Sequence, residues 1–547
     1  MGGASARTPA IDWSEYGLIR REPARTPPPG PWTCGAIIEQ ARQAWPDREA
    51  LIGRHGRFTY AELAEEIVAA TCALQALGVS AGDRVAATTA NHLEIVIAFF
   101  AAQQLGAIWV GVNRVLAAPE KRYILEDSGA SLYLADRATA AQIAPLRETL
   151  PDLRTIVEME PGEYGGEWAG LLRRHRGEIP DLDAPDPHAP AAIAYTSGTT
   201  GFPKGVVHSQ YNMILVGAVA RLTGAAREIQ RGGVALPLTI LNLMILGPVS
   251  AFQVGRACIA MDRIDALGLA EWIARERVEH FSAAPATIYD LLTKPEVRPE
   301  DLVSLKAPGA GGAAIPDSFR DLYRRKFGKE LGFGYGLTEA PTVVTSNDPT
   351  LAALPGCSGR PSRHLRVSIQ TPEGKVLAPG ESGEICVAAA DAGDLAGLYT
   401  PMLGYWRKPE ATAQALRGGW LHTGDMGRLD ADGNLFVEGR RNDVVIRGGA
   451  NVYPAEIERV MQADDRVADC AVVGRPDERL GETVVAFVQP SPGAAASDDL
   501  REALLTLCRE NLARYKVPEE IVFVTDMPRN AMNKVVKAEL KARHFEG

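Results

Sequence analysis

Residues 195–205 read Tyr-Thr-Ser-Gly-Thr-Thr-Gly-Phe-Pro-Lys-Gly, and they follow a short apolar run, 191–194, of the length of a strand. The glycines let backbone N–H groups approach an anion closely, and Lys204 adds a positive charge. Four aliphatic hydroxyls add further donors, those of Thr196, Ser197, Thr199 and Thr200. The order of residues differs from that of a Walker A loop. The stretch therefore predicts a polyphosphate-binding loop of another kind.

Short apolar segments alternate with longer helical patterns from this loop outward. Thr59 with Glu62 predicts the N-terminal cap of a helix that ends at Gly78, and a further helix is expected over 93–105. Strands are expected at 84–87, 131–134, 191–195, 233–237 and 256–260. Because strands that alternate with helices form largely parallel sheets, this part predicts layered α/β subdomains.

The pattern changes after residue 360, where short strands with Gly and Asp turns predict a β-rich subdomain over about 360–440. Its strands are expected at 367–370, 384–387 and 434–437. A compact α+β unit follows, with helices near 454–463 and 498–513 and strands near 470–473, 483–488 and 520–524. We therefore predict a large N-terminal domain over 1–440 and a small C-terminal domain over 441–547. Residues 1–30, rich in Pro, Gly and Arg, predict a loosely held arm.

Composition narrows the class of protein. The 547 residues carry a formal net charge of −10, whereas nucleic-acid-binding proteins normally have a basic face, so no nucleic-acid partner is expected. Seven scattered cysteines without a C-x-x-C pair or Cys/His cluster predict neither a zinc site nor a disulfide framework. The N-terminus has no apolar signal segment, and the apolar stretches 93–112 and 240–261 contain polar residues. We expect these stretches to be core elements of a cytoplasmic enzyme without a membrane span.

Six further motifs lie C-terminal to this loop. They are Gly334-Tyr335-Gly336-Leu337-Thr338-Glu339, Gly383-Glu384-Ile385, Trp420-Leu421-His422-Thr423-Gly424-Asp425, Gly439-Arg440, Gly448-Gly449, and Pro528-Arg529-Asn530 with Lys534. With residues 195–205 they span almost the whole chain, and they resemble the adenylate-forming superfamily of acyl-CoA synthetases, stand-alone adenylation domains and luciferases. The resemblance is to the acyl-CoA synthetase branch, and it implies a C-terminal domain that rotates about a hinge near Asn442.

The resemblance implies a role for each motif in joining a carboxylate to the α-phosphate of ATP. The implied phosphate contacts are Thr196, Ser197, Gly198, Thr199, Thr200 and Lys204. The implied nucleotide pocket consists of Gly312, Ala313, Gly334, Tyr335, Gly336 and Thr338, with Asp425 and Arg440 at the ribose. Glu339 would hold Mg²⁺, and Gly448 and Gly449 would line a tunnel for coenzyme A. The implied catalytic side chains are Thr338, Glu339 and Lys534, whose ammonium neutralises charge between the attacking carboxylate and the phosphate.

Three positions depart from the family pattern. Asn533 stands where glycine usually precedes the lysine, and we expect the turn to survive because Asn tolerates the left-handed conformation. Asn442 stands at the hinge in place of Asp or Lys. In the acyl-pocket motif the usual aromatic residue and histidine are missing, so we expect an aliphatic and wider wall. The pocket residues are then Thr239, Ile240, Asn242, Leu243 and Gly311.

These features predict an ATP- and Mg²⁺-dependent carboxylic acid:CoA ligase that forms an acyl-adenylate and then a thioester. Since 237–246 contains no acidic residue, an apolar aliphatic, alicyclic or aromatic acid is favoured over an amino acid. The alternative is a stand-alone adenylation enzyme that loads a carrier protein, although only residues 535–547 follow Lys534, so no attached carrier domain is expected. A non-catalytic nucleotide sensor is disfavoured by the retained Glu339, Asp425, Arg440 and Lys534. A homodimer is compatible with this prediction.

Overall fold

The structure divides into two compact units by its internal contacts. It is a computed structural model that describes residues 11–545 except 117, 163–165, 197–202, 225–228, 284, 307, 311–316, 329–330, 333, 348–353, 355, 441–444, 448–449, 453, 478–479, 513 and 531–532. Unit 1 comprises Met1–Arg263, Gly336–Thr342 and Ala388–Leu421, and unit 2 comprises Ile264–Tyr335, Val343–Val387 and His422–Gly547. The predicted domain boundary near residue 440 stays a prediction.

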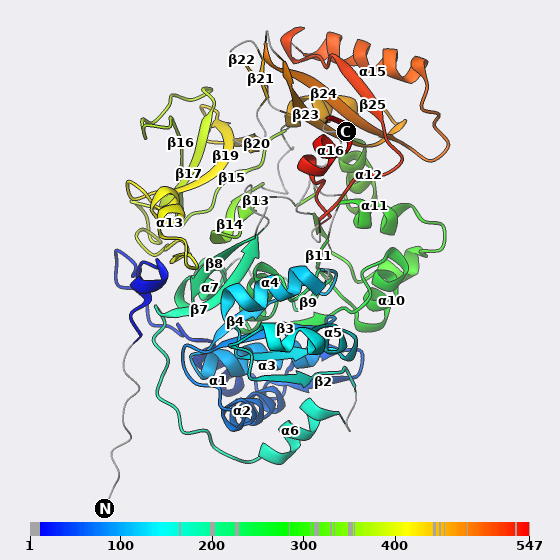
Figure 1. Cartoon of the computed structure of the whole chain (residues 1–547). Coiled ribbons are helices and arrows are strands. Elements are labelled where there is room, and N and C mark those ends of the chain that lie inside the picture. The colour runs from blue at the N-terminus through cyan, green and yellow to red at the C-terminus, as the bar shows by residue number, and fades with distance from the viewer. Residues whose placement is uncertain are drawn as a thin grey trace, which may run out of the picture. The chain divides into compact units, whose positions relative to one another are not determined.

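Unit 1 is built on a seven-stranded sheet (Figure 1). Its order is β18 (Gly404–Tyr405), β8 (Lys204–Ser209), β7 (Pro190–Thr196), β4 (Ile108–Gly111), β3 (Arg84–Thr88), β5 (Leu132–Ala135) and β6 (Thr155–Glu158). The five strands β7, β4, β3, β5 and β6 are parallel to one another, whereas β8 is antiparallel to β7 and β18 is antiparallel to β8. The largely parallel sheet predicted from the alternating pattern is confirmed.

A second sheet of unit 1 has four strands. Its order is β2 (Gly56–Thr59), β1 (Glu49–Gly53), β10 (Ala257–Ala260) and β9 (Arg231–Val234), and the last three are parallel. The strand expected over 233–237 is β9, which begins and ends earlier because Gly232 and Gly233 already pair with Cys258 and Ile259.

The helices of unit 1 supply much of its core. They are α1 (Cys34–Ala44), α2 (Tyr60–Ala76), α3 (Leu93–Gln104), α4 (Ala118–Ser128), α5 (Arg137–Ile143), α6 (Glu167–His175), α7 (Gln210–Thr223), α8 (Leu241–Met244), α9 (Ser250–Phe252) and α13 (Pro409–Ala415). Thr59 and Glu62 make both hydrogen bonds of a capping box at the start of α2, as predicted. Helix α3 is buried over most of its length. Across the described residues, no helix is long and apolar enough to span a bilayer.

Unit 2 contains several smaller sheets. Strands β11 (Ser282–Ala283) and β12 (Gly309–Ala310) form a pair. In a three-stranded sheet, β14 (Ala340–Ser346) lies between β13 (Gly334–Leu337) and β15 (Arg360–Pro361), and the residues Gly336–Thr342 of this sheet are counted with unit 1. The predicted β-rich part is a sheet of β16 (Leu365–Gln370), β17 (Gly383–Ala389), β19 (Leu421–Leu429) and β20 (Leu435–Arg440). Its helices before residue 400 are α10 (Ala266–Glu276), α11 (Pro285–Thr293) and α12 (Asp317–Phe327).

The C-terminal residues of unit 2 have the predicted α+β character. Strands β22 (Ala450–Val452), β21 (Val445–Arg447), β24 (Gly481–Pro490) and β23 (Val467–Asp477) form a sheet, and β25 (Glu520–Phe523) pairs with β24. The helices are α14 (Pro454–Met461), α15 (Asp498–Asn511) and α16 (Lys537–Phe545). The core between them contains Val472, Val484, Ala486 and Leu504. All seven cysteines of the chain are buried, and none of them forms a disulfide.

Gly111, the last residue of β4, lies against the backbone that follows β9. A Cβ atom added at Gly111 would lie 1.9 Å from the carbonyl oxygen of Thr239. Real Cβ atoms do not approach a backbone oxygen so closely, so only glycine permits this contact. Gly111 therefore sets how near the segment that contains Thr239 approaches the central sheet.

We predict that Gly111→Ala destabilises unit 1 by about 1–3 kcal/mol, because the backbone at Thr239 must move to admit a methyl group. The measurement is the midpoint of thermal unfolding, compared with Gly170→Ala. Gly170 lies inside α6, where the nearest atoms to an added Cβ are 3.6 and 3.8 Å away, so alanine there should be neutral or stabilising. Equal midpoints for the two variants would contradict the close approach.

Candidate active site

The predicted phosphate loop connects two antiparallel strands of unit 1. Strand β7 ends at Thr196, β8 begins at Lys204, and these two residues are paired across the ladder. The loop is therefore closed at its base by sheet hydrogen bonding. Four of the predicted phosphate contacts, Ser197, Gly198, Thr199 and Thr200, lie outside the described residues.

Helix α4 holds both ends of this loop. The Tyr195 hydroxyl donates to Asp127 Oδ2 at 2.7 Å, and the Tyr123 hydroxyl donates to the Pro203 carbonyl at 3.1 Å. Burial, followed by the nearby Asp127 carboxylate, raises the pKa of Tyr195 well above its usual value, so this phenol stays protonated and donates. Two side chains one helical turn apart thus fix the residues on either side of the loop.

His208 ties the Thr338–Glu339 motif to strand β8. Its Nε2 lies 2.8 Å from the Thr338 carbonyl oxygen, which can only accept, so Nε2 carries the proton. Burial lowers the pKa of His208 to about 4, so the ring is neutral near pH 7. The backbone of Glu339 is held as well, since its carbonyl accepts from the Met402 N–H at 3.0 Å. The motif is thereby fastened beside the strand that begins at Lys204.

Tyr405 contacts two of the predicted site residues. Its hydroxyl donates to Glu339 Oε1 at 2.9 Å, and the Lys204 Nζ lies 5.3 Å from the centre of its ring. The tyrosine belongs to β18, where it pairs with Val206 of β8. A cation and a carboxylate are therefore positioned by one aromatic side chain. Tyr405 was not predicted from the sequence.

The predicted acyl-pocket residues follow β9 and are held by Asn91. The Asn91 amide donates to the carbonyls of Val234 and Leu236 at 3.1 and 2.9 Å, and its oxygen accepts from the Leu238 N–H at 2.8 Å. Leu238 and Thr239 are buried, whereas Ile240, Asn242 and Leu243 are half-buried. Gly311 lies outside the described residues. A π-helical turn with Pro248 inside it continues from α8 at Ile245–Val249, because proline lacks an N–H for the regular helical bond.

Two polar atoms in this segment have no hydrogen-bond partner within the part of the chain that the structure describes. They are Thr239 Oγ1 and Asn242 Oδ1, both shielded from solvent. A buried polar atom without a partner costs free energy, so such atoms mark places where a ligand gains a hydrogen bond.

In unit 2, the Tyr335 hydroxyl donates to Asp425 Oδ2 at 2.5 Å. The glycines on either side of Tyr335 lie against backbone. A Cβ at Gly334 would lie 2.2 Å from the Thr345 carbonyl oxygen, and within unit 1 a Cβ at Gly336 would lie 3.2 Å from that of Thr342. The Gly-Tyr-Gly string is therefore explained by close packing against β14. In the backbone register of the antiparallel strands β19 and β20, Asp425 lies opposite Arg440.

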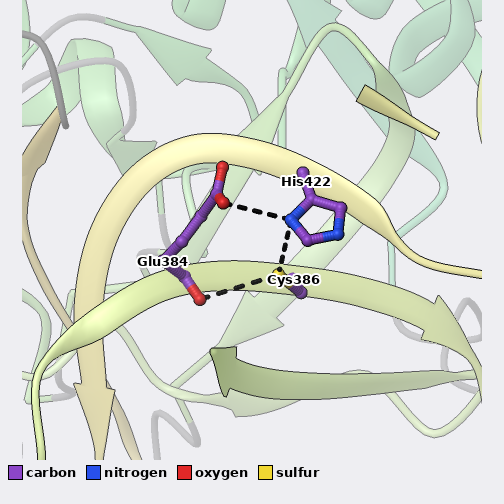
Figure 2. A group of neighbouring side chains, drawn as sticks. All are labelled: Glu384, Cys386 and His422. Atoms are coloured by element: carbon purple, nitrogen blue, oxygen red, sulfur yellow. Dashed lines mark hydrogen bonds and ion pairs between the residues drawn. The ribbon is translucent and has the colours of Figure 1, made fainter. Parts of the chain in front are cut away.

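Glu384, Cys386 and His422 converge beside Asp425, and Figure 2 shows their side chains. One potential ligand atom from each lies within 4.8 Å of the others, and all three residues are buried. This cluster was not predicted from the sequence, since the residues come from two strands separated by more than thirty residues in the chain. Sequence motifs for metal sites rely on ligands that lie close together in one segment, so they do not detect this arrangement.

Lys534 is exposed on a tight turn of unit 2. Its N–H donates to Asn530 Oδ1 at 3.0 Å, and Arg529 and Val535 form an antiparallel bridge at the base of the turn. Asn533 has φ of 60°, so the left-handed conformation expected at this position is confirmed. Of the other predicted residues, Gly312, Ala313, Asn442, Gly448 and Gly449 lie outside the described residues.

Comparison with known proteins identifies the family. Residues 38–406 match the model of the AMP-binding enzyme family, and residues 456–534 match that of its C-terminal domain. A feruloyl-CoA synthase of Amycolatopsis sp is 34% identical over 523 residues, which are 92% of this chain and 99% of the relative. The fatty acid–[acyl-carrier-protein] ligase ScoC of Streptomyces coeruleorubidus is 33% identical over 91% of this chain and 94% of its own.

Solved structures lead to the same family. The anthranilate CoA ligase AuaEII, solved in complex with anthranoyl-AMP, superposes with a TM-score of 0.83 at 28% identity, over 93% of this chain and 97% of that chain. The chain therefore belongs to the AMP-binding, adenylate-forming enzymes. Within them it is an enzyme of the acyl- and aryl-CoA ligase class, as the resemblance of its motifs predicted.

We predict that unit 1 loses stability as the pH falls from about 6.5 towards 4, in part through His208. An unfolded histidine takes up a proton below its ordinary pKa of about 6.5, whereas folded His208 resists protonation until about pH 4. The unfolded state binds more protons in this window, so unfolding becomes easier by about 2 kcal/mol at pH 5. His208→Gln keeps a donor for Thr338 and does not titrate.

Unfolding midpoints at pH 7 and pH 5 should therefore differ less in His208→Gln than in the unmodified chain. His544→Gln, at an exposed histidine, is the control and should retain the full difference. An unchanged pH dependence in His208→Gln would show that this histidine is not buried as a neutral donor.

Proposed function

We propose that this chain is an ATP-dependent carboxylic acid:CoA ligase acting on an apolar aliphatic, alicyclic or aromatic acid. The observation that carries the proposal is the grouping of Lys204, Thr338 and Glu339 on and beside strand β8, held by His208 and Tyr405. A cation, a hydroxyl and a carboxylate in one place suit a polyphosphate with its metal. The family and the feruloyl-CoA synthase relative support the same reaction class.

The first half-reaction joins the acid to ATP. The carboxylate oxygen attacks the α-phosphorus, and the bond to pyrophosphate breaks. In this proposal Thr196 and Lys204 bind the outer phosphates, Thr338 donates to the α-phosphate, and Lys534 neutralises the charge that builds between the two anions. Tyr335 stacks on adenine, while Asp425 and Arg440 bind the ribose hydroxyls.

Glu339 is the residue that would hold Mg²⁺. Its carboxylate offers the hard oxygen that this ion prefers, and Tyr405 fixes the orientation of the group through Oε1. When bound, the ion supplies positive charge to the phosphate oxygens. In the second half-reaction the thiol of coenzyme A attacks the acyl carbon and releases AMP. Gly448 and Gly449 are proposed to line its tunnel, after rotation about Asn442.

The acid pocket is proposed to be apolar except for two buried polar atoms. Ile240 and Leu243 offer hydrocarbon surface, so a charged group on the acid would be buried without a partner at a cost of several kcal/mol. These atoms are Thr239 Oγ1 and Asn242 Oδ1, and neither has a hydrogen-bond partner within the described residues. A hydroxyl substituent on the acid would satisfy them. An acid with one such substituent on an apolar body therefore fits this segment best.

Carboxylate-dependent ATP–pyrophosphate exchange across a panel of acids tests the first half-reaction, and mass spectrometry of the thioester tests the second. The second candidate function is transfer to a carrier protein, because the relative ScoC is named for that acceptor. A holo carrier protein offered in place of coenzyme A separates the two. The proposal would be overturned if none of the acids in the panel supported exchange, or if an amino acid supported it best.

We predict that Lys534→Ala slows adenylate formation by about 10²–10³-fold, because one well-placed charge is lost from the transition state. Thioester formation from supplied acyl-adenylate should be largely intact, since that step forms no bond to phosphorus. The measurement is single-turnover kinetics of the two half-reactions. Lys375→Ala, at an exposed lysine of unit 2, is the control and should leave both rates unchanged. Equal losses in both half-reactions would assign Lys534 a structural role instead.

We predict that Ile240→Trp reduces exchange with bulky acids far more than with short ones, because the indole fills part of the proposed pocket. Leu246→Trp is the matched control, since Leu246 is exposed on the neighbouring π-helical turn and should tolerate tryptophan with every acid. Exchange rates across the panel give the comparison. If Ile240→Trp slows all acids by the same factor, the pocket has been assigned to the wrong segment.

A further inference from the structure

The buried cluster of Glu384, Cys386 and His422 joins two neighbouring strands, β17 and β19, of unit 2 (Figure 2). Glu384 Oε2 lies 3.0 Å from His422 Nδ1, and Cys386 Sγ lies 3.3 Å from the same nitrogen. Glu384 Oε1 accepts from the backbone N–H of Gly424 at 3.1 Å. Both oxygens of the carboxylate therefore have donors from β19.

These contacts form a consistent network without a metal ion. An ionised carboxylate only accepts, so we assign the proton of His422 to Nδ1, facing Glu384. The Cys386 thiol donates to the Glu384 carbonyl at 3.7 Å, a normal length for sulfur. The atoms that a transition metal would require as ligands are thus engaged with one another, and the carboxylate also holds the backbone of β19.

The residue after Gly424 is Asp425, and its backbone is held from the same side. The Thr423 hydroxyl donates to the Ile385 carbonyl at 2.8 Å and accepts from the Asp425 N–H at 3.1 Å. Gly424 has φ of 73°, a left-handed conformation that glycine adopts without steric cost and that bends the strand at this residue. Strand β17 therefore contacts this bend twice, at the Gly424 N–H through the Glu384 carboxylate and at the Thr423 hydroxyl through the Ile385 carbonyl.

We propose that Glu384 is a positioning residue for ribose recognition. It fixes the Gly424 peptide and His422, and thereby sets the direction of the Asp425 carboxylate, which accepts from the Tyr335 hydroxyl at 2.5 Å. The inference rests on the proposed function, because it requires that Asp425 binds the ribose of ATP. Glu384 itself touches no substrate, and the buried cluster acts only through the bend at Gly424.

The test is the binding preference of the full chain for ATP over 2′-deoxyATP, measured by calorimetry with Mg²⁺ and without acid. Glu384→Ala leaves the Gly424 N–H without its acceptor, so Asp425 should lose its alignment. We expect the preference to fall roughly tenfold, the effect of one hydrogen bond to a charged group. Binding of 2′-deoxyATP, which keeps only one of the two ribose hydroxyls, should weaken less than binding of ATP. A collapse of the site would instead weaken both nucleotides equally and would overturn the proposal.

Conservative variants separate positioning from general stability. Glu384→Gln keeps an acceptor for Gly424 and a group that can pair with His422, so it should restore the preference to within about twofold of the unmodified chain. Glu384→Asp keeps the charge but withdraws it by one methylene, and it serves where the alanine variant does not fold. Its preference should lie between those of Ala and Gln. Equal preferences for all three variants would overturn the proposal.

Asp425→Ala distinguishes this inference from the proposed function. If Asp425→Ala keeps the ribose preference, Asp425 does not bind ribose and the proposed function of that residue fails. If Asp425→Ala loses the preference while Glu384→Ala keeps it, only the positioning role fails.

Cys386→Ala tests the competing metal site. This variant should leave the ribose preference unchanged, because the N–H groups of Gly424 and Asp425 donate to Glu384 and Thr423. Elemental analysis of the purified chain should show no stoichiometric zinc. Stoichiometric zinc that disappears in both Cys386→Ala and Glu384→Ala would replace the positioning role with a structural metal site.

Discussion

The docking of residues 403–406 along strand β8 is the interaction on which the candidate site of unit 1 depends. The Leu403 N–H donates to Val207 at 2.8 Å, and the Trp406 N–H donates to Gly205 at 2.7 Å. Between them, Tyr405 reaches Glu339 through its hydroxyl. Because β8 begins at Lys204, one short ladder determines where the cation, the carboxylate and the end of the phosphate loop lie.

The same ladder is fastened to helix α4. The buried Trp406 donates from Nε1 to the Asp127 carbonyl at 2.9 Å, while the Asp127 carboxylate accepts from Tyr195. Movement of α4 would therefore displace both ends of the loop together with β18. Steric limits add to these hydrogen bonds, since Gly111 and Gly334 stand where a single methyl group would strike a carbonyl oxygen. Backbone proximity, more than side-chain bulk, defines the positions of the motifs.

Local patterns in the sequence predicted much of this architecture. The capping box of Thr59 and Glu62 and the buried helix from Leu93 depend on neighbours within one or two turns, which the sequence displays directly. Asn533 is a further case, because its left-handed backbone follows from its own side chain.

The contacts that support the candidate site could not be predicted in this way. His208 and Thr338 are 130 residues apart, and Tyr405 and Glu339 are 66 apart. Glu384 and His422 were visible within motifs, but nothing in either string indicates that the two side chains meet. Only the strand order, which places β17 beside β19, brings them together. The residues proposed to contact substrate could therefore be predicted from sequence motifs. The residues that orient them could be identified only from the three-dimensional structure.

Charge explains why a tyrosine lies between Lys204 and Glu339. The whole chain carries a net charge of −10, so attraction for a polyphosphate must come from local groups rather than from the overall field. A direct ion pair between a lysine and a glutamate would have to be broken before the phosphates and their metal could bind. Tyr405 offers the carboxylate a neutral hydroxyl and offers the ammonium the face of its ring. The cation–π contact is worth about 0.5–1 kcal/mol and the hydrogen bond to the carboxylate about 1.5–3 kcal/mol, so both can be exchanged for contacts of similar strength to the substrate and its metal. The neutral His208 completes this arrangement, because it fixes Thr338 without adding a charge whose presence would vary with pH.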